Sequence, residues 1–70
     1  MKSIVMSTLQ EDALADLENK LDEMGVNIIE ERYDLLRRKY EVYVKANFWQ
    51  SSKLRYFVKS HGKIVIEFES

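Results

Sequence analysis

The hydrophobic and polar positions of the chain change their period along the sequence, and these changes predict alternating strands and helices. Residues 2–7 are apolar and β-branched in the middle, which is typical of a short strand. Leucines then recur at helical spacing until Gly25, a typical C-terminal stop, so we predict a helix over residues 9–24. Thr8, followed three residues later by Glu11, fits a capping box at its start.

The middle of the chain alternates with a period of two. Residues 26–33 predict a second strand, residues 34–38 a turn, and residues 40–46 a third strand. The alternation in the third strand is clear, and its expected inward face consists of Tyr40, Val42, Val44 and Ala46. The first helix would cover this face with Leu14, Leu17 and Leu21.

Residues 47–62 fit two structures. As a helix, the segment would be capped by Ser51 or Ser52 and ended by Gly62, with an apolar face made of Leu54, Phe57, Val58 and His61. As a strand, residues 53–60 would pair with residues 63–69 through a turn at His61 and Gly62. Residues 63–69 form the last strand in both cases, with Ile64, Ile66 and Phe68 expected on one face and Glu67 and Glu69 on the other.

A short internal echo favours the helix. The segment from Gly25 to Glu30 resembles the segment from Gly62 to Glu67, and each follows a candidate helix. Two βαβ-like halves would form one α+β domain over residues 1–70 with the ferredoxin-like βαββαβ plan, in which both helices cover one face of four antiparallel strands. The alternative is βα followed by a four-stranded antiparallel meander.

Length and composition limit what stabilises this domain. A chain of 70 residues has a small core and a thin stability margin. The absence of cysteine excludes disulfides, and one histidine disfavours a zinc site, so we expect a homo-oligomer as the remaining means of stabilisation. We see no signal peptide and no apolar run long enough to cross a bilayer, and therefore expect a soluble, cytoplasmic protein.

Charge is segregated along the chain although the net charge is only −1. Residues 32–63 carry nine basic residues and two acids, whereas residues 1–31 carry eight acids and two lysines. Seven of the eight aromatic residues also lie in the basic block, with Phe48 and Trp49 in an expected loop. A near-neutral total therefore conceals a strongly dipolar chain.

The basic block supplies the candidate binding residues. Cations neutralise phosphates and aromatic rings stack on bases, but the same groups also dock an acidic protein surface. The aromatics could instead be core, and the cations could face the acidic helix of the same chain or of a second copy. The candidate partner-binding or polyanion-binding residues are Arg37, Arg38, Lys39, Trp49, Lys53, Arg55 and Lys59.

Nothing in the sequence predicts catalysis. The only histidine, His61, lies at an expected helix end or turn with no nucleophile motif beside it. Glu30 and Glu31 are adjacent on a strand and point to opposite faces, so they cannot form an acid–base pair. There is no glycine-rich phosphate loop and no metal-ligand cluster, so we expect a protein that is not an enzyme and uses no metal or cofactor.

Two resemblances bear on function. The strand–helix–strand order, with Ala13 to Leu17 leading to Met24 to Ile29, is similar to small-molecule-binding ACT-type regulatory domains. That resemblance implies pairing through the sheets and an effector site at the turn before the first helix, here Ser7 to Gln10. The plan also resembles the RNA-recognition motif, which implies stacking aromatics on the two central strands, where this chain offers Tyr40 or Tyr43.

The sequence favours binding over chemistry. We expect a small regulatory or adaptor protein that docks a macromolecular partner as a homodimer, without membrane contact. The first alternative is single-strand or RNA binding through the basic–aromatic block, against which the pI of about 5.8 argues. The second is a small-molecule-sensing domain of ACT-like plan.

Overall fold

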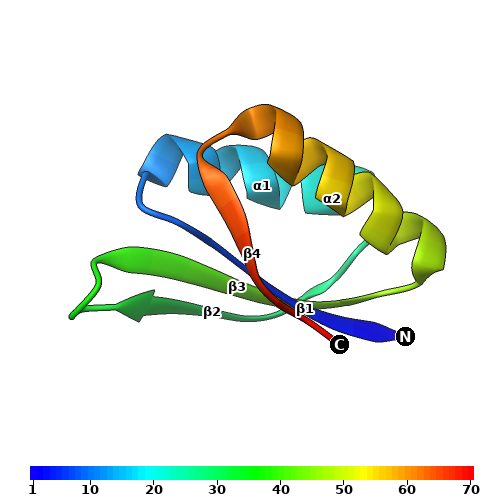
Figure 1. Ribbon diagram of the computed structural model, residues 1–70, viewed down its shortest axis with the longest axis horizontal. Coiled ribbons are helices and arrows are strands. Elements are labelled where there is room, and N and C mark those ends of the chain that lie inside the picture. The colour runs from blue at the N-terminus through cyan, green and yellow to red at the C-terminus, as the bar shows by residue number, and fades with distance from the viewer.

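The chain folds as βαββαβ, with both helices on one face of an antiparallel sheet (Figure 1). The computed structural model describes residues 1–70. Its elements are β1 (Lys2–Thr8), α1 (Glu11–Glu23), β2 (Ile28–Asp34), β3 (Lys39–Ala46), α2 (Phe48–His61) and β4 (Ile64–Glu69). The strand order is β2-β3-β1-β4, so the two edges are β2 and β4. This is the predicted ferredoxin-like fold, and the meander is excluded because residues 48–61 are helical.

The core lies between the helices and the inward face of the two central strands. Ile4 and Met6 of β1 and Val42 and Val44 of β3 are almost completely buried. The helices cover them with Ala13, Leu17, Leu21, Leu54 and Val58. Alternation in the strands and helical spacing in the helices bring these residues together, as the sequence predicts. Leu14 and Phe57 lie at the margin of the core and are only half-buried.

The predicted capping box of α1 is wrong. Thr8 is the last residue of β1, where its hydroxyl donates to the carbonyl of Lys63 at 2.7 Å. The N-cap residue is Gln10, and its side chain makes no capping hydrogen bond. The sequence motif fails because Thr8 lies two residues before the N-cap, and its hydroxyl oxygen accepts the backbone N–H of Gln10 at 3.2 Å rather than that of Glu11. The predicted end is right: α1 stops at Glu23, and Gly25 has the left-handed φ of 73° that favours glycine.

The start of α2 also differs from the prediction. Asn47, rather than Ser51 or Ser52, caps the helix in a reciprocal capping box with Gln50. Phe48 and Trp49 therefore lie in its first turn and not in a loop. Ser51 is instead buried, with its hydroxyl bonded to the carbonyl of Phe48. Gly62 ends the helix at φ 80°, as expected.

A bulge in the pairing of β1 with β4 overturns the predicted faces of β4. Ile66 lies opposite Met6, but Phe68 lies opposite Val5, so Glu67 is an extra residue between them. Phe68 consequently lies on the open face of the sheet, away from Ile64 and Ile66. Glu67 bonds to Ser7 on that open face, whereas Glu69 bonds to Arg55 of α2 on the helix side. The two glutamates therefore do not share a face.

Candidate functional site

The structure places the seven predicted binding residues in separate parts of the molecule. Arg37 and Arg38 lie in the turn between β2 and β3, at one end of the long axis (Figure 1). Trp49 lies in the first turn of α2, at the opposite end. No single basic rim joins these ends, which are separated along an axis of 32 Å.

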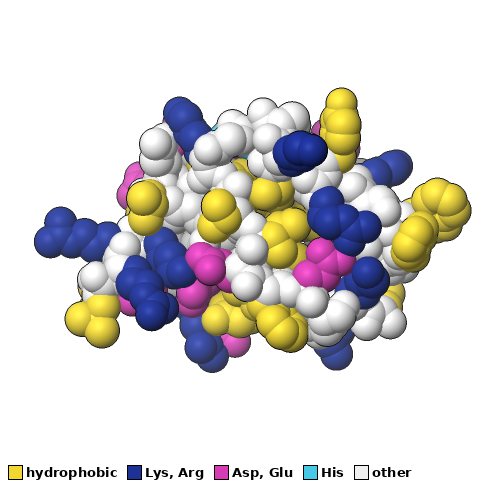
Figure 2. All heavy atoms as spheres, in the orientation of Figure 1, with side chains coloured by type: hydrophobic (Ala, Val, Ile, Leu, Met, Phe, Trp, Pro, Cys, Tyr) yellow, Lys and Arg dark blue, Asp and Glu magenta, His cyan; other side chains and the backbone are white.

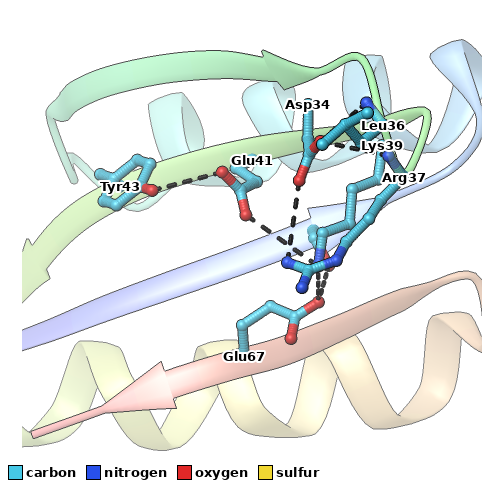
Figure 3. Close-up of polar contacts among 8 residues, drawn as sticks. Asp34, Leu36, Arg37, Lys39, Glu41, Tyr43 and Glu67 are labelled. Carbon is cyan, nitrogen blue, oxygen red and sulfur yellow. Dashed lines mark hydrogen bonds and ion pairs between the residues drawn. The ribbon is translucent and has the colours of Figure 1, made fainter.

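Two of the predicted cations are engaged in internal ion pairs around the turn (Figure 3). Lys39 is bonded to Glu67 at 2.6 Å and lies 4.0 Å from Glu41, with 15% of its side chain exposed. Arg37 lies 3.8 Å from Asp34, whose carboxylate also accepts the backbone N–H of Leu36 and of Arg37 itself. These contacts stabilise the hairpin and leave Lys39 little capacity for a partner.

The bonds to Lys39 and Ser7 also hold the pKa of the Glu67 carboxyl below its ordinary value of 4.5. The charged carboxylate accepts from the lysine ammonium and from the serine hydroxyl, and both bonds favour ionisation. The charges around Lys39 and Glu67 on the open face are thus mutually neutralised and do not form a cationic surface.

Arg55 and Arg38 have different environments. Arg55 turns from α2 toward β4, where its guanidinium is paired with Glu69 and donates to Ser52. Arg38 is exposed, makes no ion pair, and ends its turn with a left-handed φ of 55°. Side chains rarely adopt that conformation, so the turn itself would favour glycine or asparagine at this position.

The remaining three predicted residues lie together on the outer face of α2. Trp49 precedes Lys53 by four residues, and Tyr56 lies three residues from both Lys53 and Lys59, so all four project from adjacent turns of one helix face. All four are exposed, and neither lysine is in an ion pair. We call this surface the α2 stripe: Trp49, Lys53, Tyr56 and Lys59.

The aromatic residues of the stripe are not part of the core. Trp49 is 74% exposed and Tyr56 is 77% exposed. Phe48, also exposed, packs edge-on against the Trp49 ring at a centroid distance of 5.6 Å. Figure 2 shows hydrophobic side chains projecting at the end of the molecule where α2 begins. An aromatic pair left in water at a helix terminus is typical of a contact surface.

The acidic and basic parts of the chain meet between the helices. His61, the last residue of α2, lies with its Nε2 2.9 Å from a carboxylate oxygen of Asp16 in α1. Lys63 lies 4.0 Å from Asp12, and the ammonium of Lys20 lies 5.8 Å from the centroid of the Phe57 ring. These contacts show that the two helices run antiparallel. Asp12 and Asp16 of α1 therefore lie beside the C-terminal end of α2.

Sequence reasoning missed several exposed apolar residues. Tyr56 belongs to the stripe, and its spacing from Lys53 and Lys59 could have identified it once the helix was known. Leu35 and Leu36 are 80% and 96% exposed at the hairpin turn, and Val65 and Phe68 are each 55% exposed on β4. The two β4 residues could not be recognised, because only the bulge brings them to one face.

A depression of about 390 Å³ lies beside the turn between β1 and α1. Its lining includes Ser7, Thr8, Leu9 and Gln10, the segment at which an ACT-like plan would place an effector. Lys39, Lys63 and Glu67 complete its polar wall.

No three or more histidine, aspartate, glutamate or cysteine side chains lie close enough together to hold a metal ion. Neither helix has the length and apolar character needed to cross a membrane. No family model matches the chain, and no curated protein is significantly similar to it.

Proposed function

We propose that this protein is a non-enzymatic docking module that binds an acidic surface of another protein through the α2 stripe. The observation that carries the proposal is the combination, on one helix face, of exposed aromatic rings with lysines that have no internal partner. Tryptophan and tyrosine are the residue types that contribute most to protein interfaces. α2 contains no acid, so nothing within the helix neutralises the stripe.

The stripe is not required by the fold. The inner face of α2 is already buried through Ser51, Leu54 and Val58. Trp49 and Tyr56 add no comparable burial, and exposed aromatic rings without a contact favour non-specific association. A docking role supplies a reason for residues that folding does not explain.

Protein binding is favoured over nucleic-acid binding by the charges around the stripe. The neighbouring helix α1 carries six acids, so a phosphate backbone that extended from the stripe across α1 would meet repulsion. Three of the seven predicted residues, Arg37, Lys39 and Arg55, are paired internally. Tyr43 on the open sheet face is hydrogen-bonded to Glu41 and half-buried under Arg32, so it is a poor base-stacking platform. The basic surface of the α2 stripe is short, so an acidic patch on a protein fits it more closely than an extended nucleic-acid backbone does.

Paired variants test this proposal. The α2 variant carries Trp49→Ala, Lys53→Glu and Lys59→Glu, and the α1 control carries Asp22→Asn and Glu23→Gln, also at exposed helix positions. Both are used with the wild type as immobilised bait in an extract from the native cell, with and without nuclease. We expect one protein to be retained by the wild type and by the control after nuclease, and to be bound at least about tenfold more weakly by the α2 variant. The affinity is then measured with that protein purified.

Two results would contradict the proposal. One is a partner that binds the α2 variant as tightly as the wild type, because the stripe would then not be the contact surface. The other is retention that depends on nucleic acid. A fluorescent single-stranded oligonucleotide titrated at several salt concentrations identifies this case, since true polyanion binding weakens steeply with salt. Unchanged far-ultraviolet circular dichroism of both variants excludes misfolding as the cause.

The depression beside Ser7 to Gln10 supports a second candidate, small-molecule sensing. Lys63 on its wall, whose side chain is 52% exposed, would favour a small anion such as an amino or carboxylic acid, whereas Lys39 is already paired with Glu67. Thermal unfolding in the presence of a panel of amino acids and short carboxylic acids tests it. We expect a concentration-dependent rise in melting temperature that Lys63→Ala removes. A panel with no effect at millimolar concentration contradicts this candidate and leaves the docking proposal untouched.

A further inference from the structure

The turn between β2 and β3 departs from ordinary turn composition at two places. Turns usually carry glycine, proline or polar residues, yet Leu35 and Leu36 occupy this one and are 80% and 96% exposed. Arg38 closes the turn at a left-handed φ of 55°, where glycine or asparagine would be less strained. None of these residues contributes to the core. Residues that oppose local preference at an exposed site indicate a role outside folding.

The turn holds its shape without help from the leucine side chains. The carboxylate of Asp34 accepts the backbone N–H of Leu36 at 3.0 Å and that of Arg37 at 3.1 Å. Because these bonds involve only the backbone of the turn residues, the leucine side chains remain free to contact a partner. A contact made by a turn that is already ordered costs less conformational entropy than one made by a flexible loop.

Two arginines follow the leucines directly. Arg38 is exposed and makes no ion pair. The Arg37 guanidinium lies 3.8 Å from Asp34, but 74% of its side chain is exposed, and surface pairs of this kind contribute little to stability. Asp34 keeps its two backbone hydrogen bonds if Arg37 turns to another anion. Both guanidinium groups can therefore bind phosphate, whose oxygens match their planar set of donors.

The turn lies at one extremity of the molecule, whose long axis measures 32 Å (Figure 1). Leu9, in the connection between β1 and α1, is 68% exposed and lines the same depression as Lys39 and Lys63, so it lies at this end as well. Figure 2 shows hydrophobic and basic side chains together there. The end of the molecule opposite Trp49 thus has an apolar apex beside cations.

The acids at this end have partners within the protein. Glu67 is held by a lysine of β3, Glu11 accepts a tyrosine hydroxyl from the same strand, and the carboxylate of Asp12 lies 4.0 Å from the ammonium of a lysine before β4. Glu11 and Asp12 remain exposed, but they belong to the first turn of α1 and not to the hairpin. The charge of Arg38 at the apex is therefore not compensated.

This arrangement matches the layers of an anionic bilayer. Hydrocarbon lies deeper than the lipid phosphates, and here two leucines form the apex and two arginines follow them in the turn. A bilayer accepts a convex apex without a preformed cavity, whereas a protein would need an apolar pocket with acids around it. At the other end of the molecule, Phe48 packs edge-on against Trp49, and apolar and basic groups lie along a helix face.

We infer that the turn of residues 35–38 docks this protein on an anionic lipid surface, with Leu35 and Leu36 inserted among the acyl chains and both arginines on lipid phosphates. The sequence predicts no membrane contact because it contains no apolar run that could span a bilayer. Contact with one leaflet requires no such run, since a few apolar side chains and cations give reversible binding. A molecule docked in this way would present the start of α2 away from the bilayer.

Vesicle sedimentation tests the contact. Vesicles of phosphatidylcholine with about one quarter phosphatidylserine are compared, at millimolar lipid, with vesicles of phosphatidylcholine alone. We expect the wild type to bind the anionic vesicles at least about tenfold more tightly. Leu36→Asn should weaken this binding about tenfold and Arg38→Gln about fivefold, the losses expected for one inserted leucine and for one cation near an anionic surface.

The matched controls change residues away from the turn. Ile29→Asn replaces an apolar residue that is 59% exposed on β2, and Lys45→Gln removes an exposed cation of β3 that has no ion pair. Both should bind the anionic vesicles as the wild type does.

Tryptophan fluorescence measures which end of the molecule meets the lipid, because Trp49 is the only tryptophan and lies away from the turn. We expect vesicles to leave the wild-type emission unchanged. In the double variant Trp49→Phe, Leu36→Trp, the emission should move to shorter wavelength when anionic vesicles are added, and lipids with brominated acyl chains should quench it.

A wild type that does not bind the anionic vesicles at millimolar lipid would overturn the inference. Binding that Leu36→Asn leaves intact would also overturn it, because adsorption would then depend on charge alone. A shift in the emission of Trp49 would place the lipid contact on α2, and a protein partner released by Leu36→Asn, with vesicles inert, would assign the turn to a protein contact. The proposed function is tested independently, since the α2 variant leaves residues 35–38 unchanged and Leu36→Asn leaves the stripe unchanged.

Discussion

The two helices occupy equivalent places and differ on the side that faces water. α1 and α2 cover the same face of the sheet, run antiparallel, and each buries three residues completely or nearly so. The outer surface of α1 carries acids and no aromatic residue. The outer surface of α2 carries lysines and three exposed aromatic rings, those of Phe48, Trp49 and Tyr56, and the helix has no acid at all.

This difference separates what folding needs from what it leaves open. Burial of apolar side chains requires similar inner faces, and both helices satisfy that requirement. Acidic residues on the outer face of a helix generally favour solubility, which is reason enough for those of α1. The exposed rings of Trp49 and Tyr56 contribute neither to the core nor to solubility. A functional role is therefore expected for the outer face of α2.

The largest expected effect tests the equivalence of the inner faces. Leu17 and Leu54 are both completely buried, so Leu17→Ala and Leu54→Ala should each lower the free energy of unfolding by about 2–5 kcal/mol. Urea unfolding followed by circular dichroism measures both. If one variant loses less than half as much free energy of unfolding as the other, the two helices do not contribute equally to the core.

A smaller effect distinguishes the two helix starts. Asn47 caps α2 through the backbone N–H of Gln50, so Asn47→Ala should cost about 1 kcal/mol. Gln10 makes no capping bond in α1, and Gln10→Ala should change stability by less than about 0.5 kcal/mol. Equal losses in the two variants, measured by the same urea titration, would contradict the capping assignment.

The smallest effect concerns the contact of each helix with its nearest edge strand. Arg55 of α2 forms an ion pair with Glu69 of β4, whereas Glu18 of α1 contacts Glu31 of β2, so that two carboxyl groups lie together. A hydrogen bond from protonated Glu31 to Glu18 raises the pKa of Glu31 above its ordinary value of 4.5. This contact stabilises the fold below the unfolded-state pKa, and its contribution is lost as the pH rises through the higher folded-state pKa.

Glu31→Gln should therefore make the protein more stable than the wild type at pH 7, by less than about 1 kcal/mol because the site is exposed. The gain should shrink when unfolding is repeated below the ordinary pKa of 4.5. A variant that is less stable than the wild type at neutral pH would show that the two carboxyl groups do not repel each other.

Elements with strong periodicity could be predicted from the sequence. The helix ending before Gly25, the alternating strand at Tyr40 to Ala46 and the order of all six elements agree with the structure. The helix ends were predictable because a helix commonly ends at a residue with left-handed φ, which favours glycine. Gly25 and Gly62 both have this conformation. The cap of α1 was not predictable, because pairing with Tyr40 and Ile64, both far away in the sequence, extends β1 through Thr8, and the helix then starts at Glu11.

The candidate site was only partly predictable. The sequence identifies Trp49, Lys53 and Lys59 as basic–aromatic candidates, and the structure brings them together with Tyr56. The sequence alone does not show that Lys39 pairs with Glu67 and Arg55 with Glu69, because both glutamates come from the far end of the chain. Residue type identifies a charge, but only its neighbours determine whether that charge is available.

The fold class, the segregation of charge and the inner faces of the helices could be predicted, since these features depend on local periodicity and composition. Which cations stay free and which apolar residues lie on the exposed edge depends on the packing of segments that are distant in the chain. One extra residue, Glu67, is enough to move Phe68 to the other face of the sheet. Side chains along a strand alternate between the two faces with a period of two. The face on which Phe68 lies therefore depends on the register of β4 with β1 and not on the sequence of β4 alone.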